Sequence, residues 1–177
     1  NIKRGAHDTV HGRLQPPRTT AMNAGNGEHI SKLEEGLRMM LVEMAQIWRR
    51  FVPGFEHSHV ETIAPFLGTR GGPCIDGEYT MTIDDCKAGR RFDDVAYLYG
   101  QSIALRHTCG QGKCKWADVP YRVMVPKKID GLLATGRCAS CVPDTLLRNR
   151  MAAMTLGQAT GVAAVLCAQG DVPPREL

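Results

Sequence analysis

The strongest periodic pattern of apolar residues in the chain lies between residues 31 and 51. Apolar side chains recur there every three or four residues, which is the spacing of one face of an α-helix. They are Leu33, Leu37, Met40, Leu41, Met44, Ile47, Trp48 and Phe51. Ser31 and Glu34 have the spacing of a capping box and predict that the helix begins at Ser31, while Pro53 and Gly54 predict its end. We expect its apolar face to lie in the core.

A second helix is predicted from Arg150 to Gln169, because Gly170 and the prolines that follow are typical of a helix end. Small residues leave one of its sides nearly bare. They are Ala152, Ala153, Gly157, Gly161, Ala164 and Ala168. A glycine inside a helix costs about 1 kcal/mol relative to alanine, so its two glycines need a compensating reason. Close packing on a sheet is one such reason, and a helix N-terminus directed at a ligand is a second, compatible one.

Between the two helices the pattern changes to short apolar runs, which predict strands. The predicted strands lie within residues 59–83, 97–106, 120–125 and 132–135. Asp84 and Asp85 are expected to cap a short helical turn. Residues 1–30 have no sustained period and are expected to form a loop, with a short strand at residues 19–22.

Composition narrows the class of protein without changing this outline. A hydrophobic content of 43% and a charged content of 23% are typical of a soluble globular chain. The net charge of +4 is spread over basic and acidic residues alike, which predicts no nucleic-acid partner. The longest apolar run, VAAVLCA, is too short for a membrane span. The polar start predicts no secretion signal, and seven cysteines without scaffold spacing favour a reducing, cytoplasmic setting.

The order of several motifs carries a resemblance to a known family. PYRVMVPK, DGLLATGRCAS, a variable loop and RNRMAAMTLGQATGVAA follow one another from Pro120 to Ala164. VPGFE, APFLGTR and GEYTMTIDDCKAGRRFDD precede them in that order. Over roughly residues 31–170 the chain resembles the C-terminal part of FAD-dependent oxidoreductases related to the fumarate reductase and succinate dehydrogenase flavoproteins.

The resemblance implies an α+β fold in two portions. Residues 1–125 would form an antiparallel substrate-domain portion with an N-terminal loop region, and residues 126–177 the C-terminal segment of the FAD-binding domain. The strand and helix of that segment would complete a Rossmann-like layer that is supplied mostly by other residues.

The resemblance also implies the cofactor, FAD, and the residues that contact it. The segment matching ATGR would close over FAD, and the final helix would direct its N-terminus toward the pyrimidine edge of the flavin. The implied contacts are Gly136, Arg137, Arg150, Met151, Ala153 and Met154. Positive charge there would stabilise the anionic reduced flavin. The alternative role of Arg137 and Arg150 is that of structural ion-pair partners.

On the substrate side, the resemblance implies basic and hydroxyl-bearing groups above the flavin ring. The matching positions are Arg70 in GTR, Tyr79 in GEYT, His107 in LRHT and Tyr121 in PYR. His107 is predicted to transfer the proton because the ordinary pKa of histidine suits that task near neutrality. A hydrogen-bonded structural histidine is the alternative. The chain departs from the family pattern after GTR, where GGP replaces an acid and a second arginine.

A dinucleotide-binding fold needs a strand, then G-x-G-x-x-G, then a helix. Here the one G-x-G of suitable outline, at Gly110 and Gly112, lacks the third glycine and a following helix. We therefore expect the dinucleotide-binding half to lie on another chain, in an oligomer, or on a missing part of a longer one. The predicted function is hydride transfer between a small organic substrate and flavin. A non-catalytic structural or assembly subunit is an alternative of a different class.

The cysteines allow a further alternative, a metal-binding interaction module. Cys109-x-x-x-x-Cys114 and Cys138-x-x-Cys141 could together make a four-thiolate zinc or iron–sulfur site. Against this, the resemblance assigns the second pair to the turn at the flavin. Separate buried or loop thiols are the simpler interpretation, and we predict no metal ligands. A redox-active dithiol beside the flavin is the third interpretation.

Overall fold

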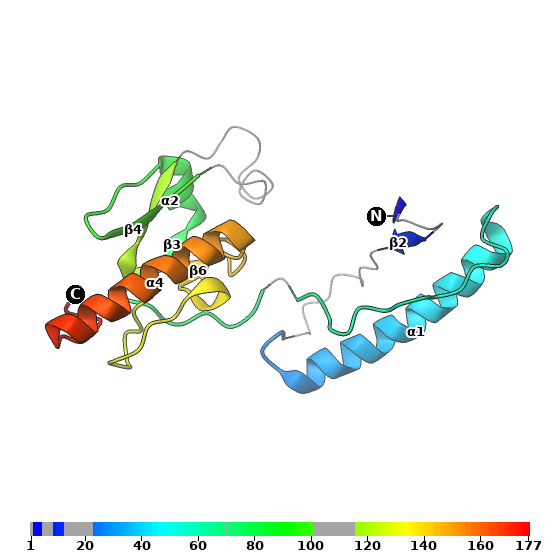
Figure 1. Ribbon diagram of the computed structural model, residues 1–177, viewed down its shortest axis with the longest axis horizontal. Helices are drawn as coiled ribbons and strands as arrows, with labels where there is room; N and C mark the ends of the chain where they lie inside the picture. The colour runs from blue at the N-terminus through cyan, green and yellow to red at the C-terminus, as the bar shows by residue number, and fades with distance from the viewer. Residues whose placement is uncertain (1, 5–8, 13–22, 70, 101–115) are drawn as a thin grey trace. The chain divides into compact units, whose positions relative to one another are not determined.

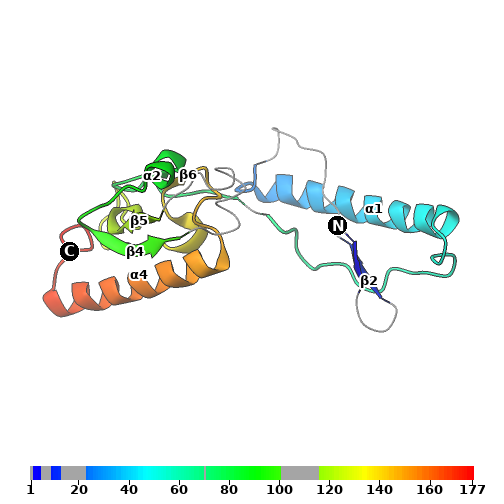
Figure 2. The same cartoon turned by 90° about the horizontal axis from the view of Figure 1, so that it is seen from above.

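The computed structural model describes residues 2–4, 9–12, 23–69, 71–100 and 116–177 (Figures 1 and 2). The chain divides into two compact units, Asn1–Thr69 and Arg70–Leu177. The predicted strand at residues 19–22 and most of the one at 97–106 lie outside the described residues.

Unit 1 begins with two short strands where a loop was expected. Strand β1 (Ile2–Arg4) pairs antiparallel with strand β2 (Val10–Gly12), so that Lys3 lies opposite His11. The expectation of an unpaired N-terminal loop is therefore wrong for these residues. Each strand has only three residues and a single large apolar side chain, Ile2 or Val10, so no alternation of apolar and polar side chains indicated them.

The long helix α1 (Gly27–Phe51) confirms the predicted helix but begins four residues earlier than expected. The Asn26 side chain is its N-cap, because Oδ1 accepts hydrogen bonds from the backbone N–H of Glu28 (2.9 Å) and His29 (3.3 Å). The predicted capping box at Ser31 is wrong, since Glu34 lies inside the helix and pairs with Arg38 (2.7 Å). The helix ends where Pro53 and Gly54 predicted.

No residue of α1 is buried, which contradicts the expectation that its apolar stripe lies in the core. Within unit 1 the irregular segment from Phe55 to Thr69 returns along the helix (Figures 1 and 2). Arg38 Nη2 donates to the Pro65 carbonyl (3.2 Å), and the rings of Trp48 and Phe55 pack edge to face with centroids 5.3 Å apart. A single irregular segment does not cover the apolar face of a helix of this length.

Unit 2 combines short strands and helices. Its elements are β3 (Met81–Thr82), α2 (Ile83–Ala88), β4 (Val95–Tyr99), β5 (Ala117–Pro120), the 3-10 turns η1 (Tyr121–Val123) and η2 (Gly136–Cys138), β6 (Cys141–Val142) and α4 (Arg150–Gly170). Strand β3 pairs parallel with β6, and β4 pairs antiparallel with β5. The predicted helix at the C-terminus is confirmed, with its first residue at Arg150 as expected.

Two predicted strands differ from the structure. A strand was expected at residues 120–125, but the observed strand β5 ends at Pro120. The chain then turns through η1, where the Tyr121 N–H donates to the Asp94 carbonyl (2.6 Å). Residues 132–135 form no strand, although the Ala134 N–H donates to the Met124 carbonyl (2.8 Å). One hydrogen bond does not make a ladder, and Leu132 is 43% exposed. Within residues 59–83 the only strand among those described is β3.

The core of unit 2 forms where three segments distant in sequence lie side by side. Backbone hydrogen bonds of 2.9 Å join Ile75 N–H to the Cys138 carbonyl, Glu78 N–H to Val125 and Ser140 N–H to Val123. The side chains buried there include Met81, Val119, Val123, Met124, Leu147 and Leu156. Gly77 is required at this crossing, because a Cβ atom on it would lie 2.7 Å from the Ser140 Cβ. The predicted substrate-domain and FAD-domain portions both contribute, and their assignment stays a prediction.

Helix α4 packs against β4 and η2, and buries Ala152, Leu156, Ala163 and Cys167 (Figures 1 and 2). It is the one helix of the described ranges that is long and apolar enough to cross a membrane by length and composition. A core helix of a soluble protein meets the same criterion, so this is weak evidence for a membrane span.

Candidate functional site

The start of α4 is held in place by an asparagine that the sequence analysis did not single out. Asn149 is the N-cap, and its Oδ1 accepts from the Ala152 N–H (2.7 Å). Its Nδ2 donates to the Tyr99 hydroxyl (3.0 Å), which in turn donates to the Leu146 carbonyl (2.8 Å). The N-terminus of α4 is thereby fixed to strand β4. An asparagine directly before the predicted first residue of a helix is a recognisable cap signal.

The turn η2 lies against α4 and begins with a glycine in the left-handed conformation. Gly136 has φ 67°, a backbone conformation that side chains disfavour, which accounts for glycine in the ATGR motif. Gly136 and Arg137 belong to this turn, and the other four predicted cofactor contacts belong to the first turns of α4. The two elements that contain the predicted cofactor residues are thus in contact with each other.

The side chains of these segments are largely accessible. Arg137 and Arg150 are exposed, and Met151 and Met154 are 73% and 70% exposed. Ala153 is half-buried, and its N–H donates to the Asn149 carbonyl (2.9 Å). Two guanidinium groups, a helix N-terminus and two exposed thioethers suit an aromatic group that acquires negative charge. This set of groups fits the flavin end of FAD.

Two of the four predicted substrate-side residues, Tyr79 and Tyr121, belong to the described residues. Arg70 and His107 lie outside the described residues. The Tyr121 hydroxyl donates to the Pro174 carbonyl (2.8 Å), and burial, with Cys167 nearby, raises the pKa of Tyr121 to about 12. Tyr121 therefore attaches the C-terminal tail to turn η1. Its use in substrate binding stays a prediction.

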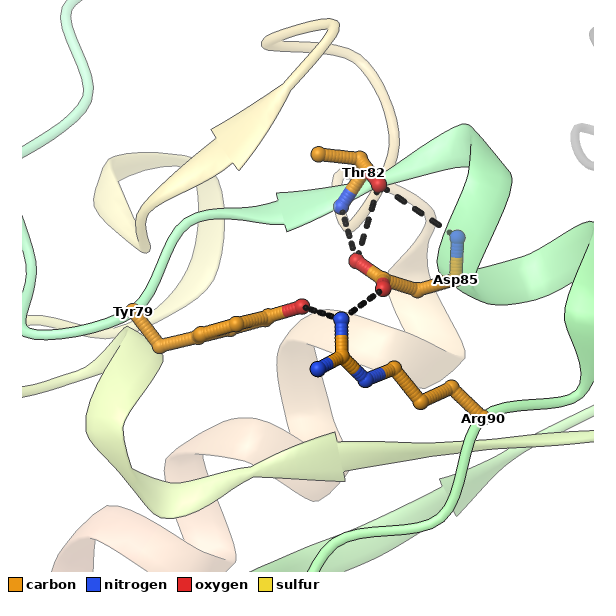
Figure 3. A network of polar contacts seen from close by, with 4 residues as sticks. All are labelled: Tyr79, Thr82, Asp85 and Arg90. Carbon is orange, nitrogen blue, oxygen red and sulfur yellow. Dashed lines mark hydrogen bonds and ion pairs between the residues drawn. The ribbon is translucent and has the colours of Figure 1, made fainter.

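Tyr79 belongs to a polar network at the start of α2 (Figure 3). Arg90 Nη1 donates to the Tyr79 hydroxyl (3.1 Å) and to Asp85 Oδ1 (3.1 Å). The other carboxylate oxygen, Oδ2, accepts from the N–H and the hydroxyl of Thr82, both at 2.8 Å. Thr82 is the N-cap and forms a capping box with Asp85, so the prediction is confirmed for Asp85, whereas Asp84 pairs with Lys87 (3.1 Å).

The ring of Tyr79 is enclosed by cationic and aromatic groups. The guanidinium carbons of Arg90 and Arg122 lie 5.7 Å from its centroid, and Phe92 packs against it edge to face at 5.0 Å. Arg122 is itself held by Asp94 through two hydrogen bonds, of 2.8 and 3.0 Å. The orientation of Tyr79 is therefore fixed from several sides.

Protonation in this network follows from burial and hydrogen bonding. Burial, followed by the neighbouring Asp85 carboxylate, raises the pKa of Tyr79. Burial alone would raise the pKa of Asp85, but hydrogen bonds from its three neighbours outweigh it and lower that pKa. Near neutrality Tyr79 keeps its proton and Asp85 is ionised. The sequence predicts Asp85 only as a helix cap, and no local signal pairs it with Arg90.

Within the described ranges, no three histidine, cysteine or acidic side chains are placed to hold a metal ion. Cys109 and Cys114 lie outside these ranges, so the four-thiolate alternative stays a prediction. Cys138 is exposed and Cys141 is buried. The two cysteines of the C-x-x-C motif thus have different surroundings.

Comparison with known proteins gives one match. A family model described as FAD dependent oxidoreductase matches residues 3–177. Searches of curated proteins and of solved structures each found no match.

Proposed function

The chain belongs to the FAD-dependent oxidoreductases, and we propose that it supplies the flavin-contacting C-terminal part of an enzyme related to the fumarate reductase and succinate dehydrogenase flavoproteins. Hydride would pass between a carbon of a small organic substrate and N5 of the flavin. The observation that supports this proposal is the packing of η2, which contains Gly136 and Arg137, against α4, whose first turns contain the other four predicted cofactor residues.

The proposed residues act by orientation and charge. FAD supplies the hydride-accepting ring when it is bound. Arg137, Arg150 and the N-terminus of α4 would hold positive potential beside that ring, where reduction adds negative charge. Asn149 supports this arrangement because it fixes the helix start to β4.

A partner layer is the second part of the proposal. The outward face of α4 exposes Met151, Met154, Val162, Val165 and Leu166, and no charged residue occurs between Met151 and Gly170. A helix that is apolar on all sides is typical of a buried helix. We propose that a dinucleotide-binding half, on another chain or another part of a longer chain, covers this face.

The substrate-side residues and the cellular setting are proposals as well. His107 would transfer the proton, and Arg70, Tyr79 and Tyr121 would line the substrate side. The fixed orientation and retained proton of Tyr79 support a hydrogen-bonding role for it. The reducing, cytoplasmic setting rests on the cysteine pattern alone.

The test is to purify the protein from its source, record its visible absorption spectrum and measure the molecular mass of every co-purifying chain. A flavin spectrum, with G-x-G-x-x-G on a partner chain or on an extension of this one, is the expected result. A colourless chain with no partner and no extension would contradict the proposal and favour a cofactor-free structural subunit.

Gly161→Ala tests the covered face of α4. A Cβ atom at Gly161 meets nothing within 4 Å in the chain alone, so alanine should stabilise the isolated chain by up to about 1 kcal/mol. In the flavin-loaded assembly the same methyl group should weaken partner binding if a layer lies close. Gly36→Ala in α1, where a Cβ atom also meets nothing within 4 Å, is the matched control and should leave partner binding unchanged. Urea unfolding and a partner titration measure the two effects, and unchanged partner binding would contradict a close layer.

A further inference from the structure

The irregular segment of unit 1 covers only part of the apolar face of α1. It contacts Arg38 and Trp48 on one side of the helix, where Leu41 lies half-buried. The adjoining part of the face is exposed. Its side chains recur at helical spacing, and their exposed fractions are 36% for Met40, 48% for Ile47 and 67% for Phe51. We call the row of these three residues the open face of α1.

Charged residues on α1 are arranged so that its two ends differ in sign. Glu28 lies in the first turn, and Arg49 and Arg50 lie in the last. Lys32 and Glu43 are exposed and lie beside the open face. A rotation of about 100° per residue places these two within about 20° of each other around the helix, and about 60–80° from the centre of the open face. One row beside this face therefore holds a basic residue in the first half of α1 and an acidic residue in the second.

We propose that the open face binds the same face of a second copy of the chain, with the two α1 helices antiparallel. When the twofold axis lies near Arg38, Lys32 of one copy lies opposite Glu43 of the other, and symmetry makes this pair occur twice. Glu28 then comes within about one helical turn of Arg50 at each end. Met40 lies close to the axis, so its long apolar side chains from the two copies pack beside each other.

The charges specify the orientation of this pair. A parallel arrangement would place Glu28 beside Glu28 and Arg50 beside Arg50, whereas the antiparallel one places each acidic end beside a basic end. Antiparallel helix dipoles also attract each other at their ends. Burial of the open face contributes to affinity, and the charges determine orientation and register.

The net charge of α1 favours a second copy over a lipid surface. Helices that lie on membranes are rich in basic residues on their polar side. In α1, four acidic residues balance four basic ones, namely Glu28, Glu34, Glu35 and Glu43 against Lys32, Arg38, Arg49 and Arg50. The helix therefore offers no net attraction to anionic lipids.

The first experiment measures the mass of the full chain in solution. Sedimentation equilibrium from about 1 to 100 µM, the range in which dimers of moderate affinity dissociate, should show a species of twice the chain mass. The same samples are mixed with phosphatidylcholine–phosphatidylserine vesicles and centrifuged, and the protein should stay in solution. The dimer needs no flavin, so this result is independent of the proposed function.

A charge on the open face should separate the copies. Ile47→Glu places a carboxylate in the interface twice, and it should raise the dissociation constant of the dimer about tenfold or more. Val42→Glu is the matched control, because Val42 is 47% exposed and lies about 140° around the same helix from Ile47. Its dissociation constant should stay within about twofold of the wild-type value.

Exchange of the flanking charges tests the antiparallel register. Lys32→Glu and Glu43→Lys each place like charges opposite one another, so each should weaken its own dimer about fivefold. An equimolar mixture of the two variants should restore the wild-type affinity, because both pairs in the mixed dimer are again opposite in sign. Circular dichroism checks that each variant keeps its helix content, and mixing would not repair a defect within one chain.

Four outcomes would overturn the proposal. They are a monomer at every concentration, a monomer that floats with the vesicles, a dimer whose affinity Ile47→Glu leaves unchanged, and charge variants that are not restored by mixing. The charge variants decide the question if Ile47→Glu fails to fold.

Discussion

The two long helices begin in the same way and differ in what surrounds them. Asn26 caps α1 and Asn149 caps α4, each through its side-chain oxygen. No residue of α1 is buried, whereas α4 buries four residues although its sequence is less amphipathic. The difference shows that local sequence can specify a helix fully while leaving its surroundings to residues elsewhere in the chain.

The two units also use their charged side chains differently. In α1, Glu28 pairs with Lys32 and Glu34 with Arg38 at 2.7 Å, and such pairs one turn apart on a helix contribute about 0.3–0.5 kcal/mol each. In unit 2 the carboxylates of Asp85 and Asp118 are buried and each pairs with an arginine. Unit 1 is therefore held mainly by local interactions, and unit 2 by interactions between distant segments.

Shortening a leucine side chain should give the largest difference in stability loss between α4 and α1. Leu156 of α4 is fully buried, so Leu156→Ala should lower the free energy of unfolding by about 3 kcal/mol. Leu37 of α1 is only half-buried, and Leu37→Ala should cost about 1 kcal/mol or less. Urea unfolding of the two variants measures both. Equal losses would mean that α1 is as well covered as α4.

The buried carboxylate should give the next largest effect. Asp85→Asn should destabilise unit 2 by about 2 kcal/mol because it removes a charge-assisted hydrogen bond to Arg90 and weakens the cap of α2. Glu34→Gln in α1 is the matched control and should cost less than about 0.5 kcal/mol.

The same variant tests the pH dependence. The pKa of Asp85 is lowered by folding, so its contribution is complete above the ordinary aspartate value of about 3.9 and is lost as pH falls through the folded pKa. Stability measured from pH 6 downward should therefore fall less steeply below about pH 4 in Asp85→Asn. Parallel curves for variant and wild type would show that Asp85 does not titrate as the network implies.

Removing the helix caps should give the smallest difference in stability loss between α1 and α4. Asn26→Ala should cost about 1 kcal/mol, as expected for a helix cap. Asn149→Ala should cost somewhat more, because Asn149 also donates to Tyr99. Asn149→Asp keeps the acceptor and loses the donor, so it isolates the tie to β4. Identical losses at both caps, by thermal unfolding, would mean that this tie contributes nothing.

The sequence was sufficient for features that local signals determine. Both long helices have unbroken helical spacing or clear ends, and the cap at Asp85 has its partner three residues away. The predicted start of α1 was wrong because Ser31 and Asn26 both suit an N-cap, and apolar periodicity begins only after Ser31. The short strands were hard to locate because their pairing depends on partners far away, as the absence of a strand at residues 132–135 shows.

In the candidate site, too, features with a local signal could be predicted, and contacts between residues without one could not. Gly136 and the start of α4 could be predicted, since the motif and its resemblance mark them directly. The contact of Arg90 with Tyr79 could not, because neither residue carries a local sign of the other.

The parallel pairing of β3 with β6 has a consequence for synthesis of the protein. Thr80 and Ser140, which hydrogen-bond beside these strands, lie 60 positions apart in the chain. At a translation rate of about 5–20 residues per second, β6 is synthesised roughly 3–12 s after β3. Met81 and its apolar neighbours stay uncovered during that interval. Newly made chains should therefore depend on chaperones, and slowed translation between these strands should lower the soluble yield.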